Sequence, residues 1–252
     1  MVRMIMHGCN GRMGKMIAGI VKNDPAIEII QGVDINTESS DGYPVVDSID
    51  KADTTADVVV DFGHASAVDK VIDWCVANGI PLVECTTGLS DDTLSKIKDA
   101  AGKIAMFKSA NMSLGINIIQ KILKENAARL AEAGFDIEIV EKHHRTKLDA
   151  PSGTALALAD SVNEGLVSRK DYVFDRSGRR MVRPDTEIGI SAVRGGTIVG
   201  DHDVIFAGQD EVITFSHTAY SRAVFAKGAV EAAKFVAGKP AGAYDMGDVL
   251  NA

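Results

Sequence analysis

The sequence predicts an α/β protein in which a doubly wound domain is followed by an α+β domain with a mixed sheet. Three observations predict this fold class. In residues 1–132 short β-rich runs alternate with helical patterns, which is typical of βαβ units and a parallel sheet covered on both faces. From residue 135 to about residue 217 strand patterns dominate. After Tyr220 a helical pattern returns.

Short apolar runs predict the strands of the first domain, and helical patterns lie between them. The predicted strands are residues 4–7, 28–33, 58–62, 81–85 and 104–107. The predicted helices are residues 12–22, 66–77 and 114–132. Ser90 is a predicted N-cap for one more helix, because Asp91 and Asp92 suit the positive end of a helix dipole.

The second half of the chain is predicted to form one sheet that is partly antiparallel. Its predicted strands are residues 135–144, 172–176, 187–196, 197–208 and 211–220. One helix is predicted at residues 154–163 and a last one at residues 222–236. We expect the last helix to pack back on the first domain.

Composition excludes several classes of function. The 252 residues are 46% hydrophobic and 25% charged, as in an ordinary globular protein. The formal net charge of −8 argues against nucleic-acid binding, which needs a basic face. Cys9, Cys75 and Cys85 form no CxxC pair, which indicates a reducing compartment without a structural metal. No apolar stretch is long enough for a signal peptide or a membrane span, so we expect a cytoplasmic protein with no membrane partner.

The first strand leads directly into HGCNGRMG, where Gly8, Gly11 and Gly14 are spaced GxxGxxG. A strand that turns sharply into a helix presents backbone N–H groups that can face a pyrophosphate, and a Cβ would block that approach. The pattern therefore predicts a Rossmann-like dinucleotide-binding domain. The alternative is a tight turn between strand and helix with no ligand.

Asp34 ends the second predicted strand, 20 residues after Gly14. A carboxylate there can accept hydrogen bonds from ribose hydroxyls and would repel a 2′-phosphate. Ile35 and Asn36 offer no cation, although Arg12 in the glycine turn can partly compensate. We expect NADH to be preferred and NADPH to be tolerated. The alternative is that Asp34 is only a turn residue.

Three more strand ends carry small residues and face the same carboxyl edge. These are residues 61–64, 85–88 and 109–112. Ligands bind at this edge in open α/β sheets. Together they are consistent with a cofactor crevice.

The segment EKHHRTKLDAPSGTA, residues 141–155, concentrates titratable groups. A metal site is not favoured, because adjacent histidines on a strand point to opposite faces and no ligand follows at helical spacing. An anion site is favoured, because Lys147 supplies a cation and Gly153 lies at a predicted helix N-terminus. A histidine near an anion gains pKa and can act as an acid. The alternative is a polar loop.

The longer segment IEIVEKHHRTKLDAPSGTALALAD resembles the signature of the 4-hydroxy-tetrahydrodipicolinate reductase family, also called dihydrodipicolinate reductase. The similarity continues along essentially the whole chain in order. It includes HGCNGRMG, DFGHASA, ECTTGLS, SANMSLGIN, SAVRGGTIVGDHDVIFAG and SHTAYSRAVFAKGAV.

The resemblance implies an oxidoreductase that transfers hydride from NADH or NADPH to a small cyclic dicarboxylate. The reaction would reduce 4-hydroxy-tetrahydrodipicolinate to tetrahydrodipicolinate in lysine and diaminopimelate biosynthesis. The resemblance also implies a dinucleotide-binding domain of residues 1–112 and 218–252. Residues 113–217 would bind substrate and form a homotetramer.

The resemblance also implies roles for individual residues. His143 falls where the family places its general acid. His144 and Lys147 fall where it contacts substrate, with Lys147 also proposed as a proton donor. Gly153 and Thr154 match its carboxylate-binding pair. The cofactor-binding stretches are matched by Gly8, Cys9, Asn10, Gly11, Arg12, Met13, Asp34, Cys85, Thr86, Thr87, Ser109, Ala110, Asn111 and Met112.

The chain departs from the family pattern at three places. Cys85 stands where many members have glycine, and Gly63 where threonine is common. Asp34 and Ile35 replace a Glu-Arg pair of members that use both cofactors. The departures at Cys85 and at Asp34–Ile35 bear on cofactor affinity and choice, and none removes a proposed catalytic group.

Two other readings remain open from the sequence. One is a different Rossmann dehydrogenase, such as an amino-acid dehydrogenase, or a semialdehyde dehydrogenase with Cys85 as a thioester-forming nucleophile. The other is a nucleotide-sensing protein without chemistry, although a sensor has no need of His143, His144 and Lys147.

Overall fold

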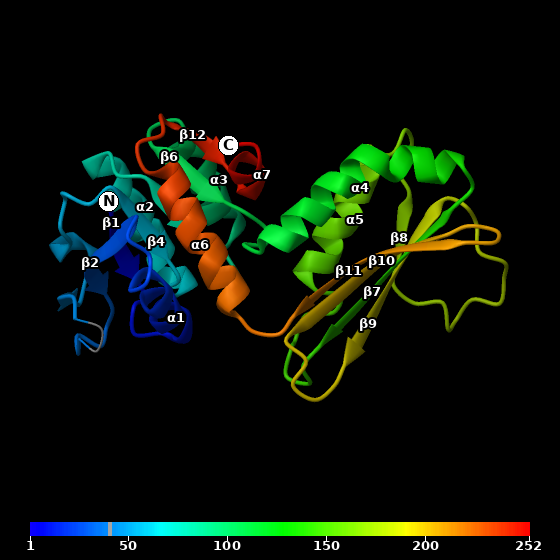
Figure 1. Cartoon of the computed structure of the whole chain (residues 1–252), viewed down its shortest axis with the longest axis horizontal. Coiled ribbons are helices and arrows are strands. Elements are labelled where there is room, and N and C mark those ends of the chain that lie inside the picture. Colours follow the sequence, from blue (N-terminus) through cyan, green and yellow to red (C-terminus); the bar gives the residue numbers. More distant parts are fainter. Residues whose placement is uncertain (40–41) are drawn as a thin grey trace. The chain divides into compact units, whose positions relative to one another are not determined.

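The structure is a computed structural model that describes residues 1–39 and 42–252. The chain forms two compact units (Figure 1). The first unit contains Met1–Ser113 and Ala223–Ala252, and the second contains Leu114–Arg222. In Figure 1 the red C-terminal segment accordingly lies with the blue and cyan N-terminal segments.

The first unit is built on a sheet whose described strands are all parallel. The strands are β1 (Val2–His7), β2 (Ile27–Val33), β3 (Val45–Val46), β4 (Val58–Asp61), β5 (Leu82–Glu84), β6 (Ala105–Lys108) and β12 (Gly242–Tyr244). Their order is β12-β6-β5-β4-β1-β2-β3. The central strands are apolar on both faces, as a sheet covered on both sides requires; Met4, Ile5 and Met6 are fully buried.

Helices cover both faces of this sheet. The helices are α1 (Arg12–Val21), α2 (Ala65–Asn78), α3 (Asp91–Ala101), α6 (Ala223–Val236) and α7 (Met246–Leu250), with a 3₁₀ turn at Ile49–Lys51. The core residues of α1 and α6 belong to one apolar cluster and those of α2 and α3 to another. Helix α6 packs against α1 and the sheet, as expected for the last helix. Ser90 caps α3 through the backbone N–H of Thr93, which confirms the predicted N-cap.

Strand order places a topological switch point between β1 and β4. From β1 the chain builds outward to β2 and β3, and then returns to add β4, β5 and β6 on the other side. The carboxyl ends of β1 and β4 therefore flank the crevice in which ligands bind in such sheets. The short elements β3, β12, α7 and the 3₁₀ turn were not predicted.

The second unit packs two helices on a five-stranded mixed sheet. The helices are α4 (Leu114–Glu132) and α5 (Gly153–Gly165), and the strands are β7 (Asp136–His143), β8 (Asp171–Val173), β9 (Glu187–Arg194), β10 (Gly200–Ala207) and β11 (Val212–Ala219). The order is β11-β10-β7-β9-β8, antiparallel at β11-β10-β7 and parallel at β7-β9-β8. The expected strands at residues 172–176 and 197–208 are shorter, ending at Val173 and starting at Gly200.

Strand period decides which side chains of β7 and β10 face the helices. Burial alternates residue by residue along both strands. Ile137 and Ile139 on β7, and Val204 and Phe206 on β10, lie in the core under α4 and α5. The same alternation turns polar residues at the strand ends toward that side.

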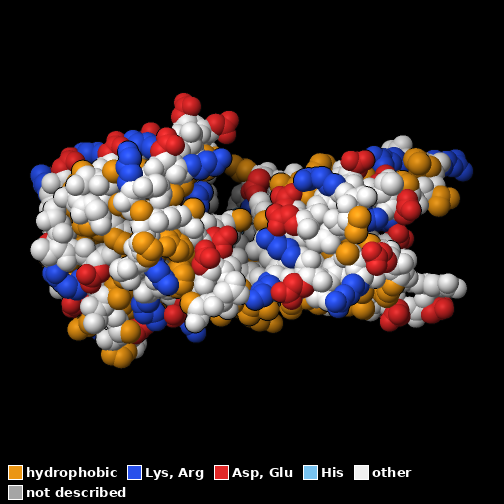
Figure 2. All heavy atoms as spheres, turned by 90° about the horizontal axis from the view of Figure 1, so that it is seen from above, with side chains coloured by type: hydrophobic (Ala, Val, Ile, Leu, Met, Phe, Trp, Pro, Cys, Tyr) orange, Lys and Arg blue, Asp and Glu red, His pale blue; other side chains and the backbone are white. Residues whose placement is uncertain are grey.

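The surface is charged without one dominant sign on the face in Figure 2. Lysine and arginine side chains alternate there with aspartate and glutamate side chains over both units. In the described parts of the chain, no helix is both long and apolar enough to cross a lipid bilayer.

Candidate functional site

The glycine turn after β1 is shaped partly by the fold itself. Gly8 has φ +77°, and a Cβ there would lie 2.7 Å from the carbonyl oxygen of Phe62. A Cβ on Gly14 would lie 2.3 Å from the carbonyl oxygen of Cys9. The close approach of the turn to the backbone after β4 therefore requires Gly8, and the packing of α1 on the turn requires Gly14, with or without a ligand.

The N-terminus of α1 carries the stronger indication of a ligand. Its N-cap is Gly11, which provides no capping side chain, and no acidic residue lies in the first turn. The helix dipole at this end is thus left without a negative partner from its own sequence, which suits a phosphate group.

Asp34 lies beside the glycine turn, as the sequence predicts. Its Oδ2 accepts the backbone N–H of Asn10 at 2.9 Å, and its Oδ1 accepts that of Asn36 at 3.0 Å. The side chain of Asn10 donates in turn to the carbonyl oxygens of Asn36 and Glu38. The turn and the carboxylate are fixed to each other, so a nucleotide on α1 would meet Asp34.

The other predicted cofactor stretches follow neighbouring strands of the same sheet. Residues 85–87 follow β5, where the backbone N–H of Cys85 donates to the carbonyl oxygen of Asp61. Residues 109–112 follow β6, where Asn111 accepts the backbone N–H of Ser113. Because β1, β4, β5 and β6 are adjacent and parallel, these stretches share one edge with the glycine turn.

Cys85 is not an activated nucleophile. Burial, followed by the negative charges of Glu84 and Asp61, raises the pKa of its thiol well above the usual range. A reactive cysteine needs the opposite environment, in which the thiolate is favoured. The structure therefore argues against a thioester-forming semialdehyde dehydrogenase.

In the second unit, His143 is held by a buried carboxylate two residues earlier on the same strand. Glu141 and His143 share the inner face of β7, and Glu141 is fully buried. Nδ1 of His143 donates to Oε2 of Glu141 at 2.6 Å. This bond fixes the ring and leaves Nε2 as the atom that can exchange a proton with a ligand.

Glu141 is ionised because strong donors surround it. Arg194, at the end of β9, binds its two oxygens with both guanidinium NH₂ groups at 2.7 Å. The backbone N–H of Ser152 adds a third bond at 3.0 Å. Burial alone would raise the pKa of Glu141, but Arg194 and His143 hold it below its usual value.

The expected rise in the pKa of His143 does not occur in the ligand-free chain. Burial is the largest effect and lowers this pKa, and the charges of Lys147 and Arg194 lower it further. The bond to Glu141 acts in the opposite direction but does not prevail. His143 is therefore mainly neutral at neutral pH until an anion binds near it.

A second buried histidine supports the same cluster. The rings of His143 and His202 meet edge to face with centroids 5.1 Å apart. Nε2 of His202 is 2.9 Å from Oγ of Ser152, which also caps α5 through the N–H of Ala155. Burial lowers the pKa of His202 to about 4, so this histidine is neutral at physiological pH.

Lys147 and the start of α5 already hold a carboxylate of the chain itself. Nζ of Lys147 is 2.8 Å from Oδ1 of Asp149. Burial would raise the pKa of Asp149, but Lys147 and the backbone N–H of Gly153 lower it. A Cβ on Gly153 would meet nothing within 4 Å, so the space beside this N–H is open. Thr154 follows in the first turn of α5.

His144 lies beyond the strand end and contacts a cavity of about 430 Å³. Its Nδ1 is 2.8 Å from Oγ1 of Thr146. The cavity is lined by His144, Arg145, Thr146, Gly196, Thr197, Val199 and Arg222. Two arginines and no carboxylate face this space, which suits an anion.

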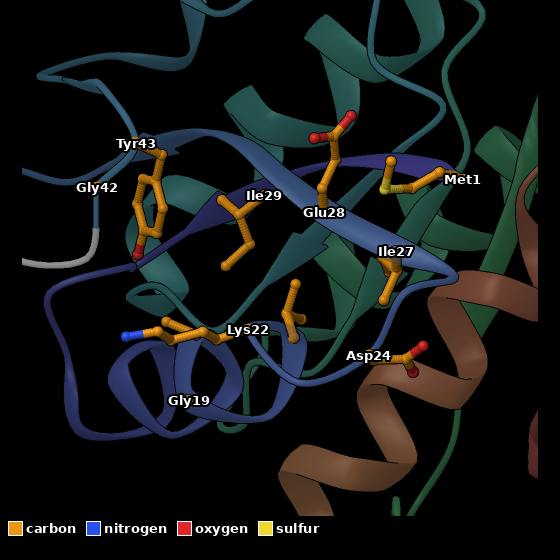
Figure 3. A pocket seen from close by; sticks show the side chains of 11 residues that line it. Met1, Gly19, Lys22, Asp24, Ile27, Glu28, Ile29, Gly42 and Tyr43 are labelled. Carbon is orange, nitrogen blue, oxygen red and sulfur yellow. The ribbon is translucent and has the colours of Figure 1, made fainter.

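A different cavity, of about 620 Å³, is lined by none of the predicted site residues (Figure 3). It is lined mainly by α1, the start of β2 and Tyr43. Within residues 1–39 and 42–252, no group of three or more His, Cys, Asp or Glu side chains could hold a metal ion.

Sequence reasoning missed Glu141, Arg194 and His202 as members of the cluster around His143. The signal for Glu141 was present, because the strand period of two places it on the same face as His143. Arg194 lies 53 residues from its partner Glu141, and His202 lies 50 residues from its partner Ser152. No local sequence pattern connects residues so far apart.

Comparison with known proteins gives one consistent family. The pattern described as "Dihydrodipicolinate reductase, N-terminus" matches residues 2–112, and "Dihydrodipicolinate reductase, C-terminus" matches residues 115–250. A 4-hydroxy-tetrahydrodipicolinate reductase of Caldanaerobacter subterraneus is 50% identical over 250 residues, with 99% of this chain and 98% of the relative covered. A 4-hydroxy-tetrahydrodipicolinate reductase of Clostridium tetani is 48% identical over 251 residues, with 100% of this chain and 98% of the relative covered.

Solved structures agree with this result. The dipicolinate-bound dihydrodipicolinate reductase of Paenisporosarcina sp. TG-14 superposes with a TM-score of 0.78 at 27% identity, covering 97% of each chain. A myo-inositol dehydrogenase of Corynebacterium glutamicum superposes with a TM-score of 0.59 at 17% identity, covering 92% of this chain and 86% of the other. The latter likeness concerns the fold alone.

Proposed function

The chain belongs to the dihydrodipicolinate reductase family of NAD(P)H-dependent oxidoreductases, and we propose that His143, Lys147 and the start of α5 carry its reaction. The reaction is the reduction of 4-hydroxy-tetrahydrodipicolinate in lysine biosynthesis. The second unit would bind the substrate, and the first would bind the dinucleotide.

One observation carries this proposal: the carboxylate of Asp149 is bound by the ammonium group of Lys147 and by the backbone N–H of Gly153. A cation and a helix N-terminus are already arranged around one carboxylate, and the substrate is a small dicarboxylate. We infer that a substrate carboxylate replaces Asp149 there, with Thr154 as a further contact. Binding at this point fixes the ring relative to His143.

His143 and Lys147 are the two candidate proton donors. Loss of the 4-hydroxyl group as water leaves a ring carbon conjugated to the imine. A bound nicotinamide would supply a hydride to that carbon, and the ring must then gain a proton. A dianionic substrate stabilises a charged histidine, so binding would raise the pKa of His143 and load Nε2 with a proton. Glu141 then stabilises the imidazolium from the other side. Lys147 supplies a cation that would neutralise the substrate carboxylate.

The cofactor would lie along the carboxyl edge of the first unit. The proposed contacts are Gly8, Cys9, Asn10, Gly11, Arg12, Met13, Asp34, Cys85, Thr86, Thr87, Ser109, Ala110, Asn111 and Met112. The uncapped N-terminus of α1 supports a pyrophosphate there. The hydroxyl of Thr86 is buried and has no partner in the described chain, which supports a ligand contact. Asp34 supports a preference for NADH over NADPH, because a 2′-phosphate would meet a carboxylate.

We further propose that the chain acts as a homotetramer in the cytoplasm. The sheet of the second unit is covered by helices on one face, and its other face carries side chains such as Lys142 and Asp203 that are still partly exposed. This face is available for a second copy. The three free cysteines are consistent with a reducing compartment.

The test is NADH oxidation with substrate made in situ by a dihydrodipicolinate synthase from pyruvate and aspartate semialdehyde, repeated with NADPH. Oxidation that depends on the synthase and is faster with NADH is the expected result. No oxidation with either cofactor, in a folded protein that still binds NADH, would contradict the proposal. Faster oxidation with NADPH would contradict only the role given to Asp34.

A further inference from the structure

Four titratable side chains form a row across the carboxyl ends of adjacent strands in the first unit. His7 on β1 pairs in register with Asp61 on β4, Asp61 with Glu84 on β5, and Glu84 with Lys108 on β6. Residues in register on neighbouring parallel strands are about 4.8 Å apart and point to the same face. The row thus reads imidazole, carboxyl, carboxyl and ammonium.

The two central carboxyl groups are completely buried, and one oxygen of each lacks a hydrogen-bond donor. Asp61 and Glu84 are each 0% exposed. Oδ1 of Asp61 bonds to Nδ1 of His7 at 2.6 Å and to the N–H of Gly63 at 2.7 Å. Oε1 of Glu84 accepts the N–H of Thr86 at 2.7 Å. The remaining oxygens, Asp61 Oδ2 and Glu84 Oε2, have no donor within the described chain.

A proton on Glu84 resolves this arrangement. Two ionised carboxylates side by side in the interior would repel each other, and each would lack a donor. If Glu84 keeps its proton, its O–H can donate to Asp61, and both oxygens are paired. A metal ion does not take this place, because no ligand group of three or more His, Cys, Asp or Glu exists among the described residues.

The surroundings of Glu84 favour the protonated form. Burial and then the charge of Asp61 raise its pKa to about 9, and the N–H of Thr86 and the charge of Lys108 offset this only in part. The thiols of Cys75 on α2 and Cys85 also lie near the pair. Burial raises the pKa of each thiol well above its usual value, so they add no charge.

Asp61 and Glu84 each hold a segment that contacts the proposed cofactor site. Asp61 fixes the turn at Gly63, in which the carbonyl oxygen of Phe62 lies 2.7 Å from the position of a Cβ on Gly8. Glu84 fixes the stretch after β5 through the N–H of Thr86. A bond between the two carboxyl groups would therefore link the glycine turn to residues 85–87.

We propose that Glu84 is a positioning residue of the cofactor site, whose protonated carboxyl donates to Asp61 and accepts from the Thr86 N–H, and so sets the distance between the glycine turn and residues 85–87. The inference rests on the proposed function, because its ligand is the cofactor of that reaction. Ionisation of Glu84 in alkaline solution breaks the bond to Asp61, and the repulsion that follows separates the two segments.

The test measures the dissociation constant of NADH by NADH fluorescence from about pH 7 to about pH 10. It compares the wild type with Glu84→Gln. A glutamine amide can donate to Asp61 and accept from Thr86, but it cannot ionise. The wild-type constant is expected to rise at least about tenfold through pH 9, the change that one pKa unit of coupling produces. The constant of Glu84→Gln is expected to vary less than about twofold.

Glu28→Gln is the matched control, since Glu28 is an exposed carboxylate on β2 of the same unit. It should show the wild-type profile. Glu84→Ala leaves Asp61 without its donor and should bind NADH weakly at every pH. An alkaline loss in Glu84→Gln equal to that of the wild type overturns the role of Glu84. Absence of NADH binding in all four proteins overturns the cofactor assignment itself.

An infrared measurement without cofactor tests the proton directly. The ligand-free wild type at pH 7 should show a protonated carboxylic-acid C=O band that Glu84→Gln lacks and that disappears as the pH rises through about 9. A wild-type spectrum at pH 7 without this band overturns the proposal.

Discussion

At the scale of single residues, the proton on His143 depends on opposing neighbours. Burial, Lys147 and Arg194 disfavour the charged ring, and Glu141 favours it. The free chain therefore holds a mainly neutral histidine, and only a bound anion would change this balance. The proposed general acid would therefore take up its proton when the substrate binds.

His143→Ala is expected to lower kcat by about 10²–10⁴-fold, the usual contribution of a general acid. The dissociation constant of NADH should change less than about twofold, because the proposed dinucleotide contacts lie in the first unit. Steady-state kinetics and NADH fluorescence measure the two quantities. An unchanged kcat would give the acid role to Lys147.

The residue that sets cofactor choice is predicted to be Asp34. Asp34→Ala removes both the acceptor for the ribose and the repulsion of a 2′-phosphate, and it also frees the N–H of Asn10. NADH should bind more weakly and its advantage over NADPH in kcat/KM should shrink by about tenfold, on the order of one lost charge-assisted hydrogen bond. Asp69→Ala, at an exposed position of α2, is the control. A fixed preference would contradict the prediction.

At the scale of elements, the start of α5 and the preceding segment form the proposed carboxylate site. Lys147→Ala is expected to raise KM for substrate and to lower kcat, because the residue both binds and neutralises. Asp149→Ala should lower KM, since it removes the internal carboxylate that competes for the same donors. Lys103→Ala, at an exposed position of the first unit, is the control. Equal KM values in all variants would show that substrate binds elsewhere.

The end of β7 depends on its neighbour β9 through Glu141 and Arg194. Glu141→Gln removes the charge that favours protonated His143, so the pKa of His143 falls further. The decline of kcat/KM as the pH rises through the pKa of His143 should then move to lower pH, as a pH–rate profile would show. Arg194 loses its charged partner, and the free energy of unfolding should fall on the order of 3 kcal/mol. A profile identical to the wild type would remove Glu141 from the mechanism.

At the scale of the whole molecule, buried histidines couple folding to pH. The pKa of His202 is about 4 in the folded chain and 6.5 in its reference state, so the unfolded chain takes up the proton first. Stability contributed by neutral His202 is present above pH 6.5 and is lost as the pH falls toward 4. The slope for one proton is at most about 1.4 kcal/mol per pH unit. His202→Gln should flatten this acidic loss in urea titrations, and an unchanged slope would contradict the assignment.

The sequence by itself determined the fold class, and it predicted where both proposed sites lie. Alternating apolar runs predicted the parallel sheet, and the strand-to-helix turn at Gly8 predicted a nucleotide site at one edge. The segment at residues 141–155 predicted an anion site at a helix start. These features were readable because each depends on the period, turn or cap of a few consecutive residues.

Only the tertiary structure decided which distant groups share a proton or a charge. The pairing of Glu141 with Arg194, the contact of His143 with His202, and the addition of β12 to the sheet edge join residues far apart in the chain. Strand register and burial set these distances and the local dielectric, and neither is encoded within a local window of sequence. The sequence predicted His143 as an acid. It could not predict the lowered pKa of His143, because that pKa depends on burial and on neighbours that only the fold brings close.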